Sequence, residues 1–482
     1  MKNILLKTIN LSCLTMVFML FFATALQADV GLAPILSDGM VLQQEKPLSI
    51  WGQANKGEEI TVTFGKSKVT TQADDEGKWI ATLESQKANA VGQSLIVKGN
   101  NTIEIKDVLV GEVWFCGGQS NMKYELSKTT YGKDEVGKAD YPNIRLCNSR
   151  GSWLRCSPES VKKFSAVAYF FGKNLHKKMN VPVGIILRAQ NGTIIEPWIP
   201  LEGYKKLDSL KKYVDIINKN KGIKPIKGEP ALPSSRFTGA IEPLTPFTLR
   251  GIVWYQGESN CIFPVEGEAV YGSYTDKMYA FVEGWREKFR QKDLSFYYVQ
   301  IAPHRYSKCS YDKKKVLTIN SLPMFWEAQL ACLKKITNCG MVVISDLGKG
   351  LHPLNKRDVG YRLSLWALAK NYGKTDIVYS GPIYKSMNVN KNKISLEFDY
   401  VGTGLKSLDG KDLTYFQIAG KDKKFVAAKA TIKGEKIIVE SAEVASPVAV
   451  RFAWDEGASH NFGNKGDLPA SPFRTDDWVM VP

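Results

Sequence analysis

Apolar runs alternate with stretches of helical periodicity through the middle of the chain. Five runs are predicted to be strands: Val108 to Cys116, Val181 to Leu187, Leu249 to Tyr255, Leu294 to Ile301 and Met341 to Ser345. Four stretches are predicted to be helices: Ala166 to Met179, Tyr274 to Arg290, Met324 to Ile336 and Lys356 to Tyr372. Strands this apolar, alternating with helices, predict a doubly wound α/β domain with a parallel sheet covered on both faces.

Shorter runs with strict alternation flank this region on both sides. Residues 29–107 hold short alternating segments separated by Gly, Asn and Asp, which predict an N-terminal β domain of the sandwich type. Short strands with Gly-containing turns return in residues 376–482 and predict a C-terminal β module. The α/β domain is therefore expected to span residues 108–375.

The first 28 residues differ from the rest of the chain. Lys2 and Lys7 precede an apolar run from Leu11 to Leu26, and small residues follow up to Ala28, which is the pattern of a secretory signal peptide. Polar residues interrupt the run, so it falls short of a membrane anchor. We expect residues 1–28 to be removed and the mature protein, without a membrane span, to be periplasmic or extracellular.

Composition narrows the function classes only slightly. The 482 residues carry a formal net charge of +17, but the excess is spread along the chain and no nucleic-acid-binding motif accompanies it. We therefore expect no nucleic-acid partner. Seven cysteines follow the signal peptide; their spacing matches no zinc module, and no particular disulfide is predicted.

Chemistry-bearing residues follow four of the predicted strands. Ser120 follows the first strand, Gly192 the second, Asn260 the third and His352 the fifth. Carboxyl ends of parallel strands meet at one edge of a sheet, so these residues are expected to lie together. Taken alone, Ser120 after two glycines is either a nucleophile at a helix N-terminus or only the residue that caps the helix.

Four segments carry a resemblance to a known family: Gly117 to Met122, Asn191 to Trp198, Gly251 to Asn260, and Leu351 to Pro353 with Lys356 and Gly360. They resemble the SGNH hydrolases and, more closely, the sialate O-acetylesterase family within them. The resemblance covers nearly the whole mature chain. It implies an SGNH-type, flavodoxin-like sheet flanked by β-sandwich-like modules.

The resemblance also implies catalytic roles. Ser120 would attack an ester carbonyl and His352 would take its proton, with the backbone N–H groups of Ser120 and Gly192 and the side chain of Asn260 as oxyanion donors. The chain contains only four histidines: His176, His304, His352 and His460. Among them His352 follows the last strand and is the preferred base, with His304 as the rival.

The third catalytic member departs from the simpler SGNH enzymes. Many of them place an aspartate three residues before the histidine, where this chain has Lys349. Asp346, six residues before His352, either turns back to the imidazole or only caps a turn. A backbone carbonyl is the other candidate for orienting the ring, which would leave a Ser–His dyad.

Five further residues are candidates for substrate binding: Gln119, Gln256, Glu258, Arg188 and Trp198. Glu258 either binds sugar hydroxyls or orders its loop. Trp198 either stacks on a sugar or packs in the core. Arg188 either pairs with a substrate carboxylate or forms a structural salt bridge.

These observations predict a secreted carbohydrate esterase that removes O-acetyl groups from sialic acids and needs no metal or organic cofactor. The first alternative has the same chemistry on another substrate, acetylated xylan or a similar plant glycan. The second is a noncatalytic carbohydrate-binding protein. The expected partner is in each case a sugar, O-acetylated if the protein is an enzyme.

Overall fold

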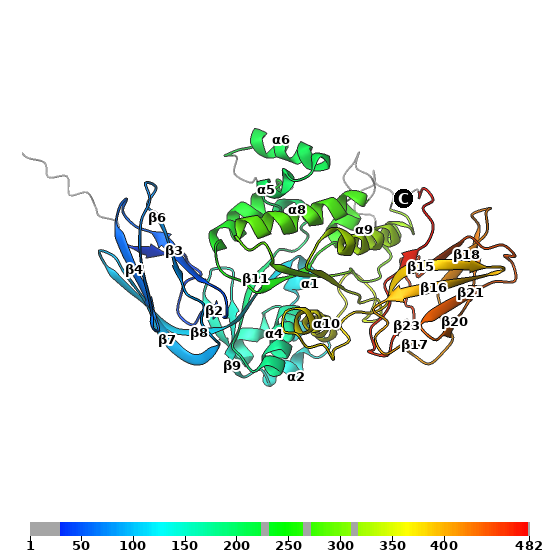
Figure 1. The fold of residues 1–482 in the computed structure, drawn as a ribbon, viewed down its shortest axis with the longest axis horizontal. Coiled ribbons are helices and arrows are strands. Elements are labelled where there is room, and N and C mark those ends of the chain that lie inside the picture. The colour runs from blue at the N-terminus through cyan, green and yellow to red at the C-terminus, as the bar shows by residue number, and fades with distance from the viewer. Residues whose placement is uncertain (1–28, 223–230, 264–270, 310–316, 481–482) are drawn as a thin grey trace, which may run out of the picture.

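Three parts follow one another along the chain in the computed structural model (Figure 1): a β domain, a central α/β domain and a second β module. The structure describes residues 29–222, 231–263, 271–309 and 317–480. The expected signal peptide, residues 1–28, lies outside the described residues. Within the described ranges, none of the helices has the length and hydropathy that a membrane crossing requires.

The central sheet is built from the five predicted strands: β8 (Thr102–Gly118), β11 (Val183–Ala189), β12 (Gly251–Tyr255), β13 (Ser295–Val299) and β14 (Cys339–Val342). They lie in the order β11-β8-β12-β13-β14, and every neighbouring pair is parallel. In chain order this is the flavodoxin-like arrangement, which places ligands beyond the carboxyl ends of the strands. The predicted doubly wound fold is confirmed.

Helices cover both faces of this sheet. α4 (Ala166–Met179) and α10 (Lys356–Lys370) pack together on one face, and α8 (Gly272–Lys288) and α9 (Ser321–Lys335) lie on the other (Figure 1). Two edge strands were not predicted: β9 (Tyr141–Cys147), parallel to β11, and β10 (Trp153–Cys156), antiparallel to β9. The shorter helices between strands include α2 (Gly132–Gly137), α3 (Pro158–Lys162), α5 (Leu201–Tyr204) and α6 (Lys211–Lys219).

Strand β8 belongs to two sheets. Its first half pairs antiparallel with β7 (Asn89–Lys98), and its second half is the first strand of the central sheet. Burial alternates before Val108 and is continuous from there to Gly118. The sequence predicted a new domain at residue 108 because the pattern changes there; the change marks where the same strand passes from a half-exposed sheet to a fully covered one.

The N-terminal domain is a pair of facing sheets, and its core is continuous with that of the α/β domain. The strands of one sheet are β1 (Gly31–Leu32), β3 (Leu48–Gln53) and β6 (Lys78–Leu83). The other sheet joins β4 (Glu59–Phe64), β5 (Ser67–Gln72) and β7 to β8, and β2 (Val41–Gln43) runs parallel to the middle of β8.

The C-terminal module has a hydrophobic core of its own. Its sheets are formed by β15 (Ile383–Asn390), β16 (Lys393–Asp399), β20 (Lys429–Lys433) and β21 (Lys436–Glu440); by β18 (Phe416–Ala419), β19 (Phe425–Ala427), β22 (Ala449–Phe452) and β24 (Phe473–Arg474); and by β17 (Leu405–Ser407) with β23 (Phe462–Asn464). Glu456 of this module accepts hydrogen bonds from the backbone and hydroxyl of Ser307, in the loop after β13. The module therefore supports a loop at the carboxyl edge of the central sheet.

Candidate active site

A sharp corner at the end of β8 presents Ser120. At Gly118 the backbone has φ +139°, and a Cβ would lie 2.1 Å from the carbonyl oxygen of Tyr255 on β12, so the position requires glycine. The backbone N–H of Gln119 donates to the same oxygen at 3.0 Å. Helix α1 (Ser120–Lys123) begins directly after this residue, with Gln119 and not Ser120 at the cap position. The hydroxyl of Ser120 is therefore free of the capping role.

His352 lies opposite this serine, in the loop after β14. Its Nε2 is 2.8 Å from Oγ of Ser120. Burial lowers the pKa of His352, and the positive charge of Lys356 and the nearby His304 lower it further. A neutral imidazole at hydrogen-bond distance from a hydroxyl is suited to accept its proton. The structure thus brings together the two residues that the sequence singled out as nucleophile and base.

A buried carboxylate sets the orientation of Asn260, which lies in α7 (Glu258–Ile262). Its Oδ1 accepts from the backbone N–H of Ile195 at 2.9 Å, and its Nδ2 donates to Glu196 at 3.0 Å. Glu196 also accepts from Lys277 at 2.6 Å, and both charged side chains are buried. An amide nitrogen has two hydrogens, so the bond to Glu196 leaves one for another acceptor.

Gly192 occupies an open turn after β11. Its φ is +67°, and a Cβ there would meet no heavy atom within 4 Å. Unlike the glycine at the end of β8, this one is not required by close packing of the protein itself. The space beside the turn leaves the backbone open to the approach of a substrate.

Comparison with known proteins identifies the family. Residues 110–347 match the family described as carbohydrate esterase, sialic acid-specific acetylesterase. The crystal structure of a carbohydrate acetylesterase from Xanthomonas citri is 35% identical, with a TM-score of 0.80 over 93% of this chain and 100% of that one. This chain belongs to the sialic acid-specific acetylesterase family. Sialate O-acetylesterases of Homo sapiens and Pongo abelii are each 26% identical over 92% of the chain and 91% of their own length.

The acetylesterase is therefore an ester hydrolase and not a noncatalytic carbohydrate-binding protein, which was the second alternative. The predicted family and fold are both confirmed. The structure places several of the expected site residues away from the substrate side of the site.

Trp198 and Glu258 of the acetylesterase do not lie where a sugar would contact them. Trp198 is only 2% exposed; its Nε1 donates to Thr193 and its ring packs edge-on against Trp254. The expected sugar-stacking role is wrong, because the core covers the ring. Glu258 is also 2% exposed and accepts a hydrogen bond from Asn121, so it orders the loop and does not bind sugar hydroxyls.

Gln119 and Gln256 are also internal. Nε2 of Gln256 lies within hydrogen-bond distance of Gln119, of the carbonyl of Thr193 and of Asn260 at 2.7 Å. The two glutamines join the ends of β8, β11 and β12 and do not face a substrate. Arg188 donates through one nitrogen to the backbone carbonyls of Asn148 and Leu187, so the expected salt bridge is replaced by carbonyl contacts.

Asp346 is paired with an arginine and not with the catalytic candidate. Both of its carboxylate oxygens accept from Arg362 on α10, at 2.6 and 2.5 Å. Within the described part of the chain, no hydrogen bond joins Asp346 to His352. The expectation that this carboxylate turns back to the imidazole is therefore not met, which favours the alternative of a Ser–His dyad.

The other histidines have separate surroundings. Nδ1 of His176 lies 2.7 Å from the carbonyl of Val181. Nε2 of His304 lies 3.3 Å from the sulfur of Cys309. His460 is buried with Nε2 2.8 Å from the hydroxyl of Ser345, at the contact between the C-terminal module and the central sheet. In the described chain, His352 alone has its ring nitrogen on Ser120.

Sequence reasoning named Asn121 and Lys356 only as part of the family resemblance and gave them no role, and it did not single out Glu196 or Lys277. Lys356 carried a signal, because a lysine at the first position of a helix opposes the helix dipole and so indicates a specific partner. Glu196 and Lys277 are 81 positions apart. No local pattern marks them as a pair.

Proposed function

We propose that this acetylesterase removes O-acetyl groups from sialic acids, with Ser120 as nucleophile and His352 as general base. The observation that carries the proposal is the 2.8 Å contact between Ser120 Oγ and His352 Nε2 at the carboxyl edge of the sheet. The sialic acid substrate is supported by the family description and by the names of the mammalian relatives.

The mechanism follows from these positions. Ser120 Oγ attacks the acetyl carbonyl carbon while Nε2 of His352 takes the hydroxyl proton. The negative charge on the carbonyl oxygen is met by the backbone N–H groups of Ser120 and Gly192 and by the second Nδ2 hydrogen of Asn260. His352 then returns the proton to the sugar oxygen as the C–O bond breaks. Water, deprotonated by His352, hydrolyses the acetyl-serine and releases acetate.

A second candidate substrate is an O-acetylated plant glycan such as acetylated xylan. It is favoured by the Xanthomonas citri protein, which is more similar in sequence than the mammalian enzymes and whose name specifies only a carbohydrate acetylesterase. The chemistry at Ser120 is the same for both substrates.

Acetate release by the purified protein distinguishes the substrates. We expect kcat/KM on O-acetylated sialic acid to exceed that on acetylated xylan by about tenfold or more, a difference of about 1.4 kcal/mol in transition-state binding. An enzymatic acetate assay at matched acetyl concentration measures it, with the Ser120→Ala protein as the blank for spontaneous hydrolysis. Faster release from xylan would assign the enzyme to plant glycans.

We propose also that the protein is exported. The support is the charged and then apolar pattern of residues 1–28. N-terminal sequencing of protein secreted by the producing cell is expected to begin at Asp29. A first residue within 1–20 would contradict cleavage.

A further inference from the structure

One amide joins the backbone next to Ser120 to the backbone next to His352. Asn121, which follows the serine, donates from Nδ2 to the carbonyl oxygen of Leu351, which precedes the histidine, at 2.8 Å. The Asn121 side chain is fully buried. This hydrogen bond closes a short ring that contains the nucleophile and the base, so the distance between them depends on it.

The orientation of that amide is set by two buried charges. Nδ2 of Asn121 donates also to Glu258, and its Oδ1 accepts from Nζ of Lys356. If the amide were flipped, its oxygen would face a carboxylate and a carbonyl and its nitrogen would face an ammonium group. Only one orientation is compatible with all three neighbours.

Burial of the Glu258 and Lys356 charges costs desolvation free energy. Glu258 is 2% exposed and Lys356 is fully buried. Burial raises the pKa of Glu258 and lowers that of Lys356, and the attraction between the two opposes both shifts. Apolar side chains of similar size commonly replace such a pair without loss of stability. Stability alone therefore gives no reason to keep the pair beside the nucleophile.

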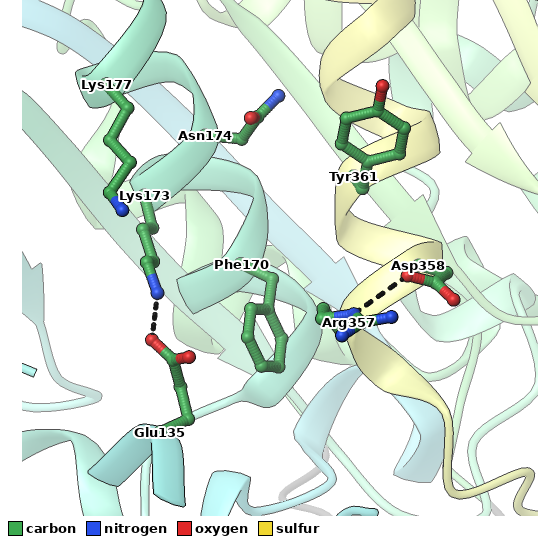
Figure 2. A pocket seen from close by; sticks show the side chains of 8 residues that line it. All are labelled: Glu135, Phe170, Lys173, Asn174, Lys177, Arg357, Asp358 and Tyr361. Carbon is green, nitrogen blue, oxygen red and sulfur yellow. Dashed lines mark hydrogen bonds and ion pairs between the residues drawn. The ribbon is translucent and has the colours of Figure 1, made fainter. Parts of the chain in front are cut away.

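Arg357, the residue after Lys356, shows that a cation on this helix turn has access to the surface. Arg357 lies in an open pocket between α4 and α10, paired with Asp358, as Figure 2 shows. Its guanidinium also stacks 3.8 Å from the ring centre of Tyr131. Lys356 points the other way, into the site, within 5.0 Å of the ring centre of Tyr255.

We propose that Asn121, held by Glu258 and Lys356, is a positioning residue that fixes the alignment of Ser120 with His352. The three residues are called the Asn121 clamp below. The inference rests on the proposed function, since alignment matters only if these two residues do the chemistry. Misplacement of reacting groups by about 1 Å costs about 10²-fold in rate.

The clamp also sets the charge around the base. The charged and titratable groups near His352 are Lys356 on α10, His304 after β13 and, behind the lysine, Glu258 on α7. The Tyr124 ring lies 5.8 Å from the imidazole. Since a nearby ammonium disfavours the imidazolium, loss of the lysine charge raises the pKa of His352.

Substitution of the amide is the first test, made on the full chain with an aryl acetate. Asn121→Ala and Asn121→Asp, which lacks both N–H donors, are expected to lower kcat about 10²-fold with KM changed less than about threefold. The matched control is Asn464→Ala: Asn464 is equally buried and donates to the carbonyls of Ser380 and Tyr400 in the C-terminal module. We expect it to lower stability and leave kcat unchanged.

Removal of the Glu258 and Lys356 charges together is the second test. It can be made even if the Asn121 variants do not fold. The double variant Glu258→Gln/Lys356→Met is expected to lower kcat about 10²-fold, because the Asn121 amide loses the charges that orient it, and to shift the acid limb of kcat/KM to higher pH. Arg357→Met next to it is expected to leave both unchanged. Wild-type kcat in the folded double variant overturns the proposal, as does a folded Asn121 variant with wild-type kcat or with a change confined to KM. Wild-type protein with no more esterase activity than Ser120→Ala would overturn the proposed function itself, a different result.

Discussion

Replacing Ser120 by alanine is expected to reduce kcat for acetyl ester hydrolysis by about 10⁴-fold or more. The reason is that no other hydroxyl replaces Oγ at 2.8 Å from Nε2 of His352, so neither attack on the carbonyl nor its proton transfer takes place. The corner itself depends on Gly118 and not on the serine side chain, so the variant is expected to fold. Steady-state kinetics with an aryl acetate, beside a thermal unfolding curve, measure both effects.

The chain offers a matched control for this prediction. Ser345 has the same distance, 2.8 Å, between its hydroxyl and Nε2 of a histidine, His460. Both residues are buried at the contact with the C-terminal module, and burial lowers the pKa of His460 to about 4. Substrate does not reach that pair, so Ser345→Ala should keep kcat within about threefold. If Ser120→Ala kept a tenth of the activity, the nucleophile would have to be sought elsewhere.

Replacing His352 by alanine is expected to lower kcat by about 10⁴-fold in the same aryl acetate assay, since Ser120 then has no base.

The pH dependence of kcat/KM in the wild-type enzyme also reports on this base. Because only the neutral imidazole accepts the proton, kcat/KM falls as the pH drops through the pKa of His352, which burial and Lys356 place below the usual value of about 6.5. The acid limb is thus expected on the acidic side of pH 6.5, measured from pH 4 to 9 at constant ionic strength.

Two variants separate this dyad from the alternatives that the sequence left open. His304→Ala removes the rival base and is expected to cost less than about tenfold. Asp346→Asn breaks the pair with Arg362 and is expected to have a similarly small effect on kcat. Replacement of a true third triad member costs about 10⁴-fold, so a loss of that size in Asp346→Asn would restore the triad.

The strands and the Ser120–His352 pair could be predicted from the sequence for a simple reason. Strands buried on both faces read as unbroken apolar runs, and a parallel sheet brings all their carboxyl ends to one edge. The order of residues after each run was therefore enough to place a serine and a histidine together.

Contacts that join distant segments could not be predicted in this way. Asp346 and Arg362 meet across a loop and a helix, and Trp198, in a short helix after β11, packs against Trp254 of β12. Burial, which decides whether a tryptophan or a glutamate meets substrate, is a property of the packed chain. The contacts of the Asn121 clamp could not be predicted for the same reason, since its three residues come from three different segments.

Strand β8 has a consequence for any attempt to shorten this protein. A fragment that began at residue 108 would keep Ser120 but would lose residues 102–107 of β8, the strand that leads to it. It would also lose β2 and β7, which pair with that strand. The hydrophobic core would lose its N-terminal residues and be exposed there, because the sandwich and the central sheet share it. The smallest fragment that retains an intact nucleophile corner therefore includes the N-terminal sandwich.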